Sequence, residues 1–516
     1  MPDKSNGWTV TVKLPKPSLD DNRADADRLR TALKSALNAE DLDIDIPLLK
    51  TLPSRLRKCS YQVRCLCFND YGRWRLIGIK ASADQTPFLG IAVDLGTTRV
   101  VLRLTDLDTG EKMAEQAFDN PQTAIGPDIL ERIHYADKAG GLEELNRLII
   151  DGFQTHIEKL CGEAGGCAED IYLMAVAGNT SMAHLFMGLA PGGIIREPYI
   201  PVVNRPDLIP AASLNLKLHQ DAGIFVFPNV GSYFGGDLIS GILYSGLSES
   251  EKISMLVDVG TNAEVVLGNR DWLVVCAGAA GPALEGGASK IGMTAGPGVI
   301  DQVMIDPETR RFNLHTIDDQ PPKGICGSGM IDLVAQLFLA GLLDIRGRLV
   351  PEAAPERIYE TNDERRLVVA DEEASATGKA LTLGQADFDS LIRSKAAMYT
   401  ILETITSYVG ITFNDLSRFY VAGTFGSFIR PRSAITIGMI PDLPEATFQS
   451  LGNSSLGGAS RLLGARTAMD QIERIYQNIT YIELNVNQAF MNRFSAAKFL
   501  PHTEAAHFPS VKSPHF

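Results

Sequence analysis

Two short motifs of the form Asp-x-Gly-Thr-[Thr/Asn] are the part of this sequence best suited to chemistry. They read Asp94-Leu-Gly-Thr-Thr98 and Asp258-Val-Gly-Thr-Asn262. Glycine lets the backbone approach an anion closely, while hydroxyl and backbone N–H groups bind phosphate oxygens. An aspartate can hold a hydrated Mg²⁺, which keeps most of its waters. We therefore expect two phosphate loops that face each other and hold the phosphates of one nucleotide.

Apolar runs flank both motifs, which indicates that each lies at a turn between two strands. The runs cover residues 88–93 and 100–104 around the first motif, and 255–257 and 265–267 around the second. Two ordinary hairpins with Asp-Gly turn chemistry are the alternative. The repetition with matched flanks favours phosphate binding. Neither motif fits the dinucleotide fingerprint, which leads from a strand into a helix.

Each motif residue has an expected role. Asp94 and Asp258 are candidates to hold Mg²⁺ through water, and one of them is a candidate to orient the attacking water. Glu264 is either a second carboxylate of the site or an ordinary strand residue. The candidate phosphate-binding residues are Gly96, Thr97, Thr98, Gly260, Thr261 and Asn262.

The composition limits the class of protein. The chain has 516 residues, 45% of them hydrophobic, which is enough for about three domains with sizeable cores. Its formal net charge of −14 argues against a nucleic-acid partner and against an anionic membrane surface. No apolar run is long enough to span a bilayer, and the first residues lack the order of a signal peptide. Seven scattered cysteines favour the reducing cytoplasm.

The pattern of strands and helices predicts a small α+β domain over residues 1–86 and a larger α/β body over 87–516. The larger body is expected to have two halves, 87–235 and 236–516, because the motif recurs 164 positions later. In the front domain we expect strands at 8–14, 61–68 and 73–80. Four helices are expected at 142–160, 237–247, 330–343 and 390–409, and an exposed loop or insertion at 360–379.

A third glycine-rich segment follows an apolar strand late in the chain. It reads Phe419-Tyr-Val-Ala-Gly-Thr-Phe-Gly426. Together with the paired Asp-Gly-Thr hairpins it resembles the ASKHA superfamily of acetate and sugar kinases, heat-shock chaperones and actin. That resemblance implies a duplicated α/β ATPase fold. It also assigns the adenosine contact to Gly423, Thr424, Phe425 and Gly426.

Further blocks resemble one group within that superfamily, the RACo-like ATP-dependent reductive activators of corrinoid proteins. The matching blocks are residues 17–21, 89–98, 119–122, 178–182, 256–264, 280–285, 325–332, 422–426, 499–503 and 508–510. The resemblance covers nearly the whole chain. It implies an activity that couples ATP hydrolysis to the reduction of cobalamin Co(II) to Co(I) in a methyl-transfer system. The expected cofactors are ATP and Mg²⁺, and the expected partner is a corrinoid protein or a corrinoid-dependent methyltransferase. A homodimer is also compatible with it.

Two further segments leave alternatives open. Residues 178–180 follow a strand and precede a helix, so they either contact the γ-phosphate or cap the helix. Gly327 and Ser328 precede the helix at 330–343. Their N–H groups either face a phosphate or lie where glycines allow close packing of helix on strand.

The cysteines depart from the pattern of this group, whose members carry a plant-type 2Fe-2S domain ahead of the connecting region. The front region has only Cys59, Cys65 and Cys67, whose spacing does not match C-x₄-C-x₂-C. We therefore expect no iron–sulfur cluster in this chain, and a separate ferredoxin-like protein as electron donor. The rival interpretations are a small-molecule kinase of the same fold and an ATP-gated docking protein without turnover. A cluster-bearing activator that uses Cys276 and Cys326 is a third rival.

Overall fold

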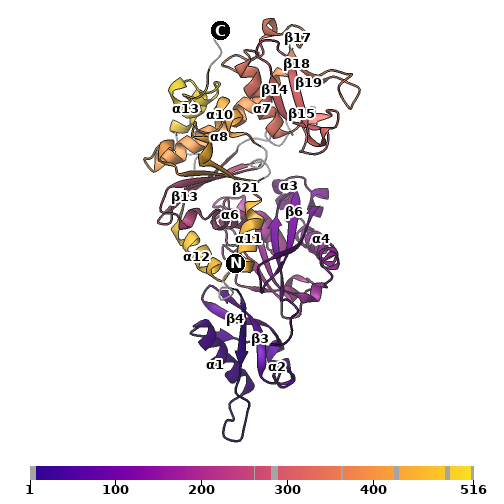
Figure 1. Ribbon diagram of the computed structural model, residues 1–516, viewed down its shortest axis with the longest axis vertical. Helices are drawn as coiled ribbons and strands as arrows, with labels where there is room; N and C mark the ends of the chain where they lie inside the picture. The colour runs from indigo at the N-terminus through magenta and orange to yellow at the C-terminus, as the bar shows by residue number, and fades with distance from the viewer. Residues whose placement is uncertain are drawn as a thin grey trace. The chain divides into compact units, whose positions relative to one another are not determined.

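The structure of the chain, a computed structural model, describes residues 7–260, 262–279, 289–361, 364–423, 429–482 and 488–512. Contacts within the chain divide it into two compact units, whose elements Figure 1 labels. The first unit contains residues 1–246 and 454–478, and the second contains 247–453 and 479–516. The chain therefore returns to the first unit after it has built most of the second.

The first unit begins with a four-stranded sheet and two helices that pack on it. The strand order is β1-β3-β4-β2. The elements are β1 (Thr9–Lys13), α1 (Asp25–Leu37), β2 (Leu42–Asp43), α2 (Ile46–Lys58), β3 (Gln62–Asp70) and β4 (Arg73–Ala81). The expected strands are confirmed. Helix α2 was not expected, because Pro53 lies inside it and proline disfavours helix interiors. Burial of Leu48, Leu52 and Leu56 on one face stabilises the helix nevertheless.

A six-stranded sheet follows, in the order β7-β6-β5-β8-β10-β9. Its strands are β5 (Leu89–Leu95), β6 (Arg99–Asp106), β7 (Lys112–Asp119), β8 (Ile171–Gly178), β9 (Ile209–Pro210) and β10 (Gly223–Val226). Strands β5, β6 and β7 pair antiparallel, whereas β8 runs parallel to β5 and β10 runs parallel to β8. Every residue of β8 is buried. Such continuous burial is typical of a strand whose sheet is covered on both faces.

Helices cover this sheet on both sides (Figure 1). Besides α1 and α2, the helices of the first unit are α3 (Ile129–Ala136), α4 (Gly141–Glu163), α5 (Thr180–Met187), α6 (Gly236–Ser245), α11 (Ser454–Gly464) and α12 (Thr467–Asn478). Helix α4 shares an apolar core with β5 and β8, while α11 packs on the same two strands and on α6. A Cβ at Gly458 would lie 2.0 Å from the Ser240 carbonyl oxygen, so glycine is needed where α11 crosses α6.

The second unit contains a six-stranded sheet in the order β21-β20-β11-β12-β13-β22. Its strands are β11 (Ser254–Val259), β12 (Asn262–Gly268), β13 (Leu273–Ala279), β20 (Arg418–Ala422), β21 (Phe448–Gly452) and β22 (Ile479–Tyr481). Three antiparallel strands are again followed by two parallel ones, as in the first unit. Both Asp-Gly-Thr motifs join the first two strands of such a set. The expected α/β architecture with a duplicated sheet is therefore confirmed.

Helices and two small sheets complete the second unit. The helices are α7 (Gly327–Leu339), α8 (Gln385–Tyr408), α10 (Pro431–Thr436) and α13 (Gln488–Ala497). The small sheets contain β14 (Val299–Ile305), β15 (Phe312–Thr316), β16 (Gly324–Ile325), β17 (Ile358–Thr361), β18 (Glu364–Ala370) and β19 (Leu381–Gly384). The expected exposed loop at 360–379 is partly wrong, because β18 lies within it. Leu367 and Val369 are buried. Their apolar run is short and follows charged residues, so the strand signal in the sequence is weak there.

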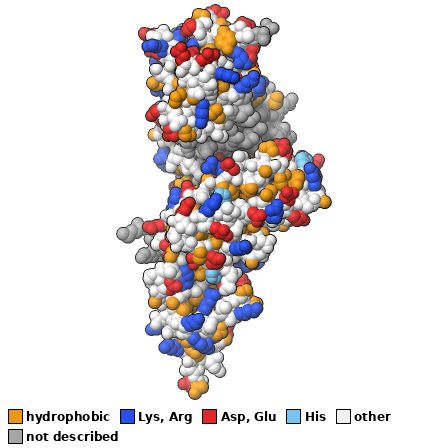
Figure 2. Space-filling view, turned by 90° about the vertical axis from the view of Figure 1, so that its right-hand side faces the viewer, with side chains coloured by type: hydrophobic (Ala, Val, Ile, Leu, Met, Phe, Trp, Pro, Cys, Tyr) orange, Lys and Arg blue, Asp and Glu red, His pale blue; other side chains and the backbone are white. Residues whose placement is uncertain are grey.

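One face of the molecule shows a surface of mixed charge. Figure 2 shows acidic and basic side chains interspersed on the face that it presents. In the part of the chain that the structure describes, no helix has the length and apolar composition needed to cross a membrane.

Candidate active site

The first motif lies in the turn between β5 and β6, as expected. Asp94 and Thr97 are half-buried, and Thr98 is exposed. A Cβ at Gly96 would lie 2.3 Å from the carbonyl oxygen of Arg99. Any residue other than glycine would therefore force this turn to open. The turn has the close backbone approach that a phosphate loop requires.

Asn179 connects this turn to the beginning of α5. Its Oδ1 accepts a hydrogen bond from the backbone N–H of Met182 at 2.9 Å, which caps the helix. Its Nδ2 donates to Oγ1 of Thr97 at 3.1 Å. The capped helix start is therefore confirmed, and the same side chain also orients a hydroxyl of the first motif. A contact of residues 178–180 with the γ-phosphate stays a prediction.

The beginning of α6 lies beside the beginning of α5. A Cβ at Gly235 would lie 2.5 Å from both Cα of Asn179 and Oδ1 of Asp237. The half-buried Asp237 carboxylate is therefore close to the residue that orients Thr97. The sequence analysis missed Asp237. A Gly-Gly-Asp sequence at the start of the expected helix at 237–247 is the feature that could have indicated it.

The second motif lies in the turn between β11 and β12, also as expected. Asp258 stands directly opposite Glu264 in this antiparallel pair, so the two side chains share one face of the sheet. Both are half-buried. Like charges directly opposite each other are destabilising, and a cation beside them offsets the repulsion. This favours the interpretation of Glu264 as a second carboxylate of the site. Gly260 is half-buried, whereas Thr261 and the Asn262 side chain lie outside the described residues.

The third glycine-rich segment begins next to the second motif. Strand β20 runs parallel to β11 and places Ala422 beside Asp258, so both strands end at the same edge of the sheet. Gly423 has a φ of +79°, a left-handed conformation that favours glycine. A Cβ there would lie 2.9 Å from Oδ1 of Asp258. The structure thus brings Gly423 and Asp258 together, while Thr424, Phe425 and Gly426 lie outside the described residues.

Cys326 precedes α7 and has a local role. Its Sγ lies 3.4 Å from the carbonyl oxygen of Ile300 and 3.1 Å from Oγ of Ser328. A Cβ at Gly329 would lie 2.3 Å from the same Ile300 oxygen. Close packing of α7 on β14 therefore explains Gly329. A phosphate contact of Gly327 and Ser328 stays a prediction.

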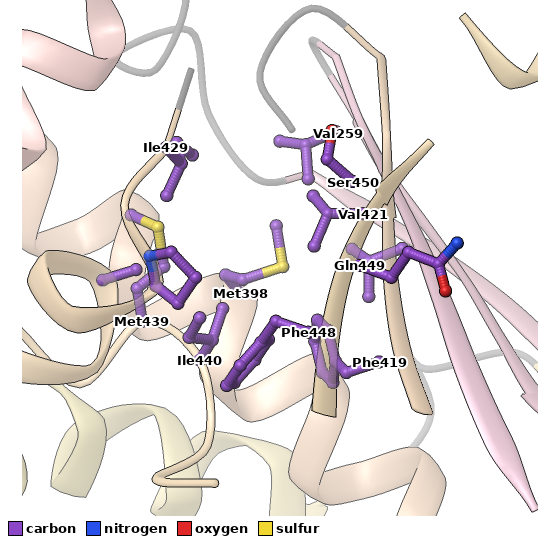
Figure 3. Close-up of a pocket in the computed structure, with 13 residues that line it drawn as sticks. Val259, Met398, Phe419, Val421, Ile429, Met439, Ile440, Phe448, Gln449 and Ser450 are labelled. Carbon is purple, nitrogen blue, oxygen red and sulfur yellow. The ribbon is translucent and has the colours of Figure 1, made fainter. Parts of the chain in front are cut away.

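An apolar cavity of about 180 Å³ lies beneath the edge of the second sheet (Figure 3). Its lining includes Val257 and Val259, which flank Asp258, and Val421, two residues before Gly423. Figure 3 shows Met398 and Met439 among its other lining side chains, from α8 and the segment after α10. The described residues that line the cavity are apolar apart from Gln449 and Ser450, and none of them is ionisable. Side chains of β11 and β20, the strands that lead to the second motif and to Gly423, form part of its wall.

The expectation that the cysteines hold no iron–sulfur cluster stays a prediction, and the structure gives the state of their side chains. All seven are free thiols, and five are buried. Burial raises the pKa of Cys67 and of Cys276 to about 12 and that of Cys161 to about 11, which disfavours the thiolate needed for a metal ligand. Among the described residues, no three His, Cys, Asp or Glu side chains are grouped to hold a metal ion.

The position of Gly423 leads to a test of the site. We expect Gly423→Ala to weaken ATP binding by roughly tenfold, because the added Cβ collides with the Asp258 carboxylate. Gly410→Ala is the matched control, since Gly410 has a φ of +74° and no atom near its Cβ position. Both variants should lose roughly 1–2 kcal/mol of stability from the left-handed backbone. Equal ATP affinities in the two variants, measured by calorimetry, would remove Gly423 from the site.

Three family models match successive parts of the chain. They are described as the RACo linker region, over residues 5–86, the RACo middle region, over 89–250, and the C-terminal domain of RACo, the ASKHA domain, over 252–512. The last match alone covers half of the chain. The matches follow one another in the order expected from the resemblance.

Relatives are similar over most of their length. The corrinoid activation enzyme RamQ of Eubacterium limosum is 30% identical over 426 residues, which cover 81% of this chain and 71% of RamQ. The [Co(II) methylated amine-specific corrinoid protein] reductase of Methanosarcina barkeri is 25% identical over 448 residues, 78% of this chain and 75% of the reductase. A solved structure of a reductive activator for corrinoid,iron-sulfur protein is 38% identical. It superposes with a TM-score of 0.86 and covers 99% of this chain and 82% of that one. The chain therefore belongs to the RACo family, and its residues 252–512 match the ASKHA domain of that family.

Proposed function

We propose that this chain is an ATP-dependent activator of a corrinoid protein in a methyl-transfer system, and that it couples ATP hydrolysis to reduction of Co(II) to Co(I). The observation that carries this proposal is the match of all three RACo regions, in order, to residues 5–512. It is supported by the similarity to a corrinoid activation enzyme over 81% of the chain.

The two hairpin motifs bind the nucleotide phosphates in this proposal. The contacting residues are Gly96, Thr97, Thr98, Gly260, Thr261 and Asn262, with Gly327 and Ser328 as further phosphate contacts. The tight turn at Gly96 supports this role, since a Cβ would fill the space beside the Arg99 carbonyl oxygen. Gly423, Thr424, Phe425 and Gly426 contact the adenosine.

Carboxylates hold the Mg²⁺ of the nucleotide. Asp94 and Asp258 would bind it through water, and Glu264 adds negative charge on the same sheet face as Asp258. This donor set of carboxylate oxygens fits a hard cation that keeps several waters. When bound there, the ion would supply charge neutralisation for the phosphates. One of the two aspartates orients the attacking water, which is the role that such carboxylates have in phosphoryl transfer.

The electron comes from outside the chain in this proposal. The cysteine spacing in the front region fits no plant-type cluster, and burial raises the pKa of the Cys65 and Cys67 thiols. A separate ferredoxin-like protein therefore supplies the electron, and the corrinoid protein receives it. Seven free thiols are consistent with a reducing cytoplasm.

The test is the appearance of Co(I) in a reconstituted mixture. The cognate corrinoid protein in its Co(II) state is combined with this protein, Mg-ATP and a reduced ferredoxin. We expect the Co(I) absorption band only when all four are present, and no stoichiometric iron in this protein when it is purified anaerobically. Co(I) formation without the ferredoxin would contradict the proposed electron source. Transfer of ³²P from ATP to a small molecule, without Co(I), would favour a kinase. An absence of ATP turnover with the partner present would favour a docking protein.

A further inference from the structure

Asn120 holds two carbonyl groups of the first motif. It is fully buried and follows the end of β7. Its backbone N–H donates to the Thr98 carbonyl oxygen at 2.8 Å, and its Nδ2 donates to the Gly96 carbonyl oxygen at 3.0 Å. Thr97 therefore lies between two peptide groups that the same residue fixes.

These bonds set the direction of a backbone N–H group. In a trans peptide the C=O and N–H bonds point in opposite directions. The Gly96 carbonyl points toward Asn120, so the N–H of Thr97, which belongs to the same peptide group, points away from it. Oγ1 of Thr97 accepts from Asn179. Asn120 and Asn179 thus orient the backbone and the side chain of one motif residue.

The orientation of the Asn120 amide is itself fixed. Its Oδ1 accepts from the backbone N–H of Gln122 at 3.0 Å, so its Nδ2 must be the atom that faces Gly96. The Gln122 side chain donates to the Leu145 carbonyl oxygen at 2.9 Å and accepts from Nη1 of Arg132 at 3.3 Å. Both Gln122 and Arg132 are fully buried.

Arg132 brings a positive charge behind the motif. Its Nε donates to the Gly126 carbonyl oxygen at 2.7 Å, and its Nη2 has no hydrogen-bond partner among the described residues. Within the described part of the chain, no carboxylate lies within ion-pair distance of it. Burial lowers the pKa of its guanidinium to about 10. The Asp128 carboxylate offsets part of this lowering of the pKa. A buried cation without an ion-pair partner is still unfavourable, and a bound polyphosphate would supply further negative charge.

We propose that Asn120 is a positioning residue that presets the first motif for phosphate binding, with the buried positive charge of Arg132 as its electrostatic support. The inference rests on the nucleotide binding proposed above. Asn120 turns the Gly96 carbonyl away from the phosphate side and the Thr97 N–H toward it. Arg132 holds Gln122, which in turn holds the Asn120 amide.

Asn120→Asp tests this directly, and the chain offers a matched control. The aspartate has the same size but cannot donate to the Gly96 carbonyl oxygen, and its charge repels both that oxygen and a phosphate. Asn146 is the control, because its Nδ2 likewise donates to backbone carbonyl oxygens, those of Leu185 at 3.0 Å and Phe186 at 2.8 Å, but at the far end of α5. We expect Asn120→Asp to weaken ATP binding by ~10-fold or more, the equivalent of at least one lost hydrogen bond. Asn146→Asp should bind ATP as the wild type does.

Arg132→Met is a second variant that does not depend on the fold surviving the first. Methionine keeps the apolar bulk but leaves the Gly126 carbonyl oxygen and Oε1 of Gln122 without their donor, so the melting temperature of this variant should fall modestly while the protein stays folded at the assay temperature. Its ATP affinity should fall severalfold, and the dependence of that affinity on salt should weaken. Wild-type affinity in both Asn120→Asp and Arg132→Met, with folded protein and a wild type that binds ATP, would overturn the inference. A wild type that does not bind ATP would instead overturn the proposed function.

Discussion

Asp258→Ala is expected to lower Mg-dependent ATP hydrolysis by roughly 10²–10³, the usual effect of removing one electrostatic stabiliser from an active site. Asp258 stands opposite Glu264 near the end of β11, and its Oδ1 lies 2.9 Å from the position that a Cβ at Gly423 would occupy. Alanine at this half-buried position leaves the backbone pairing of β11 with β12 and β20 in place, so the variant should keep the fold of the wild type. The loss should therefore appear in the hydrolysis rate and not in the circular dichroism spectrum.

Asp306→Ala is the control for this experiment. Asp306 lies in the turn after β14 of the same unit, and its carboxylate accepts the backbone N–H groups of Glu308 and Thr309. Hydrogen bonds from the backbone and side chain of Thr309 contribute most to holding the pKa of Asp306 below its usual value, and the Glu308 N–H adds to them. This variant should lose some stability through its turn and keep normal hydrolysis. Wild-type turnover in folded Asp258→Ala protein would remove this aspartate from the active site.

The local parts of the site were predictable from the sequence because their signals are local. Apolar runs on both sides of each Asp-Gly-Thr motif indicated the two hairpins, and both are present. The apolar run before Gly423 indicated a strand. Its position beside β11 follows from parallel pairing, which brings the ends of both strands to one edge.

The remaining parts depend on contacts between residues far apart in the chain. Asn120 contacts Gly96 across 24 positions, and Asn179 contacts Thr97 across 82. No local pattern specifies such pairs. The return of residues 454–478 to the first unit was missed for the same reason. The role of Glu264 was undecided in the sequence because a strand residue and an active-site carboxylate look alike. The strand register resolves which face it shares with Asp258.

Coupling between nucleotide and partner is the second large effect that we expect. ATP hydrolysis can drive an uphill reduction only if the nucleotide state changes the affinity for one form of the corrinoid protein. Linkage then requires the partner to change the ATP affinity by the same factor. A typical coupling is about 1–3 kcal/mol, or roughly 5–150-fold. Asp258→Ala should reduce this coupling as well, because the same site binds the nucleotide.

The most direct test of this account is a calorimetric titration of the cognate corrinoid protein, held in its Co(II) state, into this protein with ATP, with ADP and without nucleotide. The account predicts that the affinity with ATP differs from the other two by roughly 5–150-fold. It also predicts that saturating partner shifts the ATP affinity by the same factor. Identical partner affinities in all three conditions would leave the nucleotide no influence on the cobalt centre and would contradict the proposed activation.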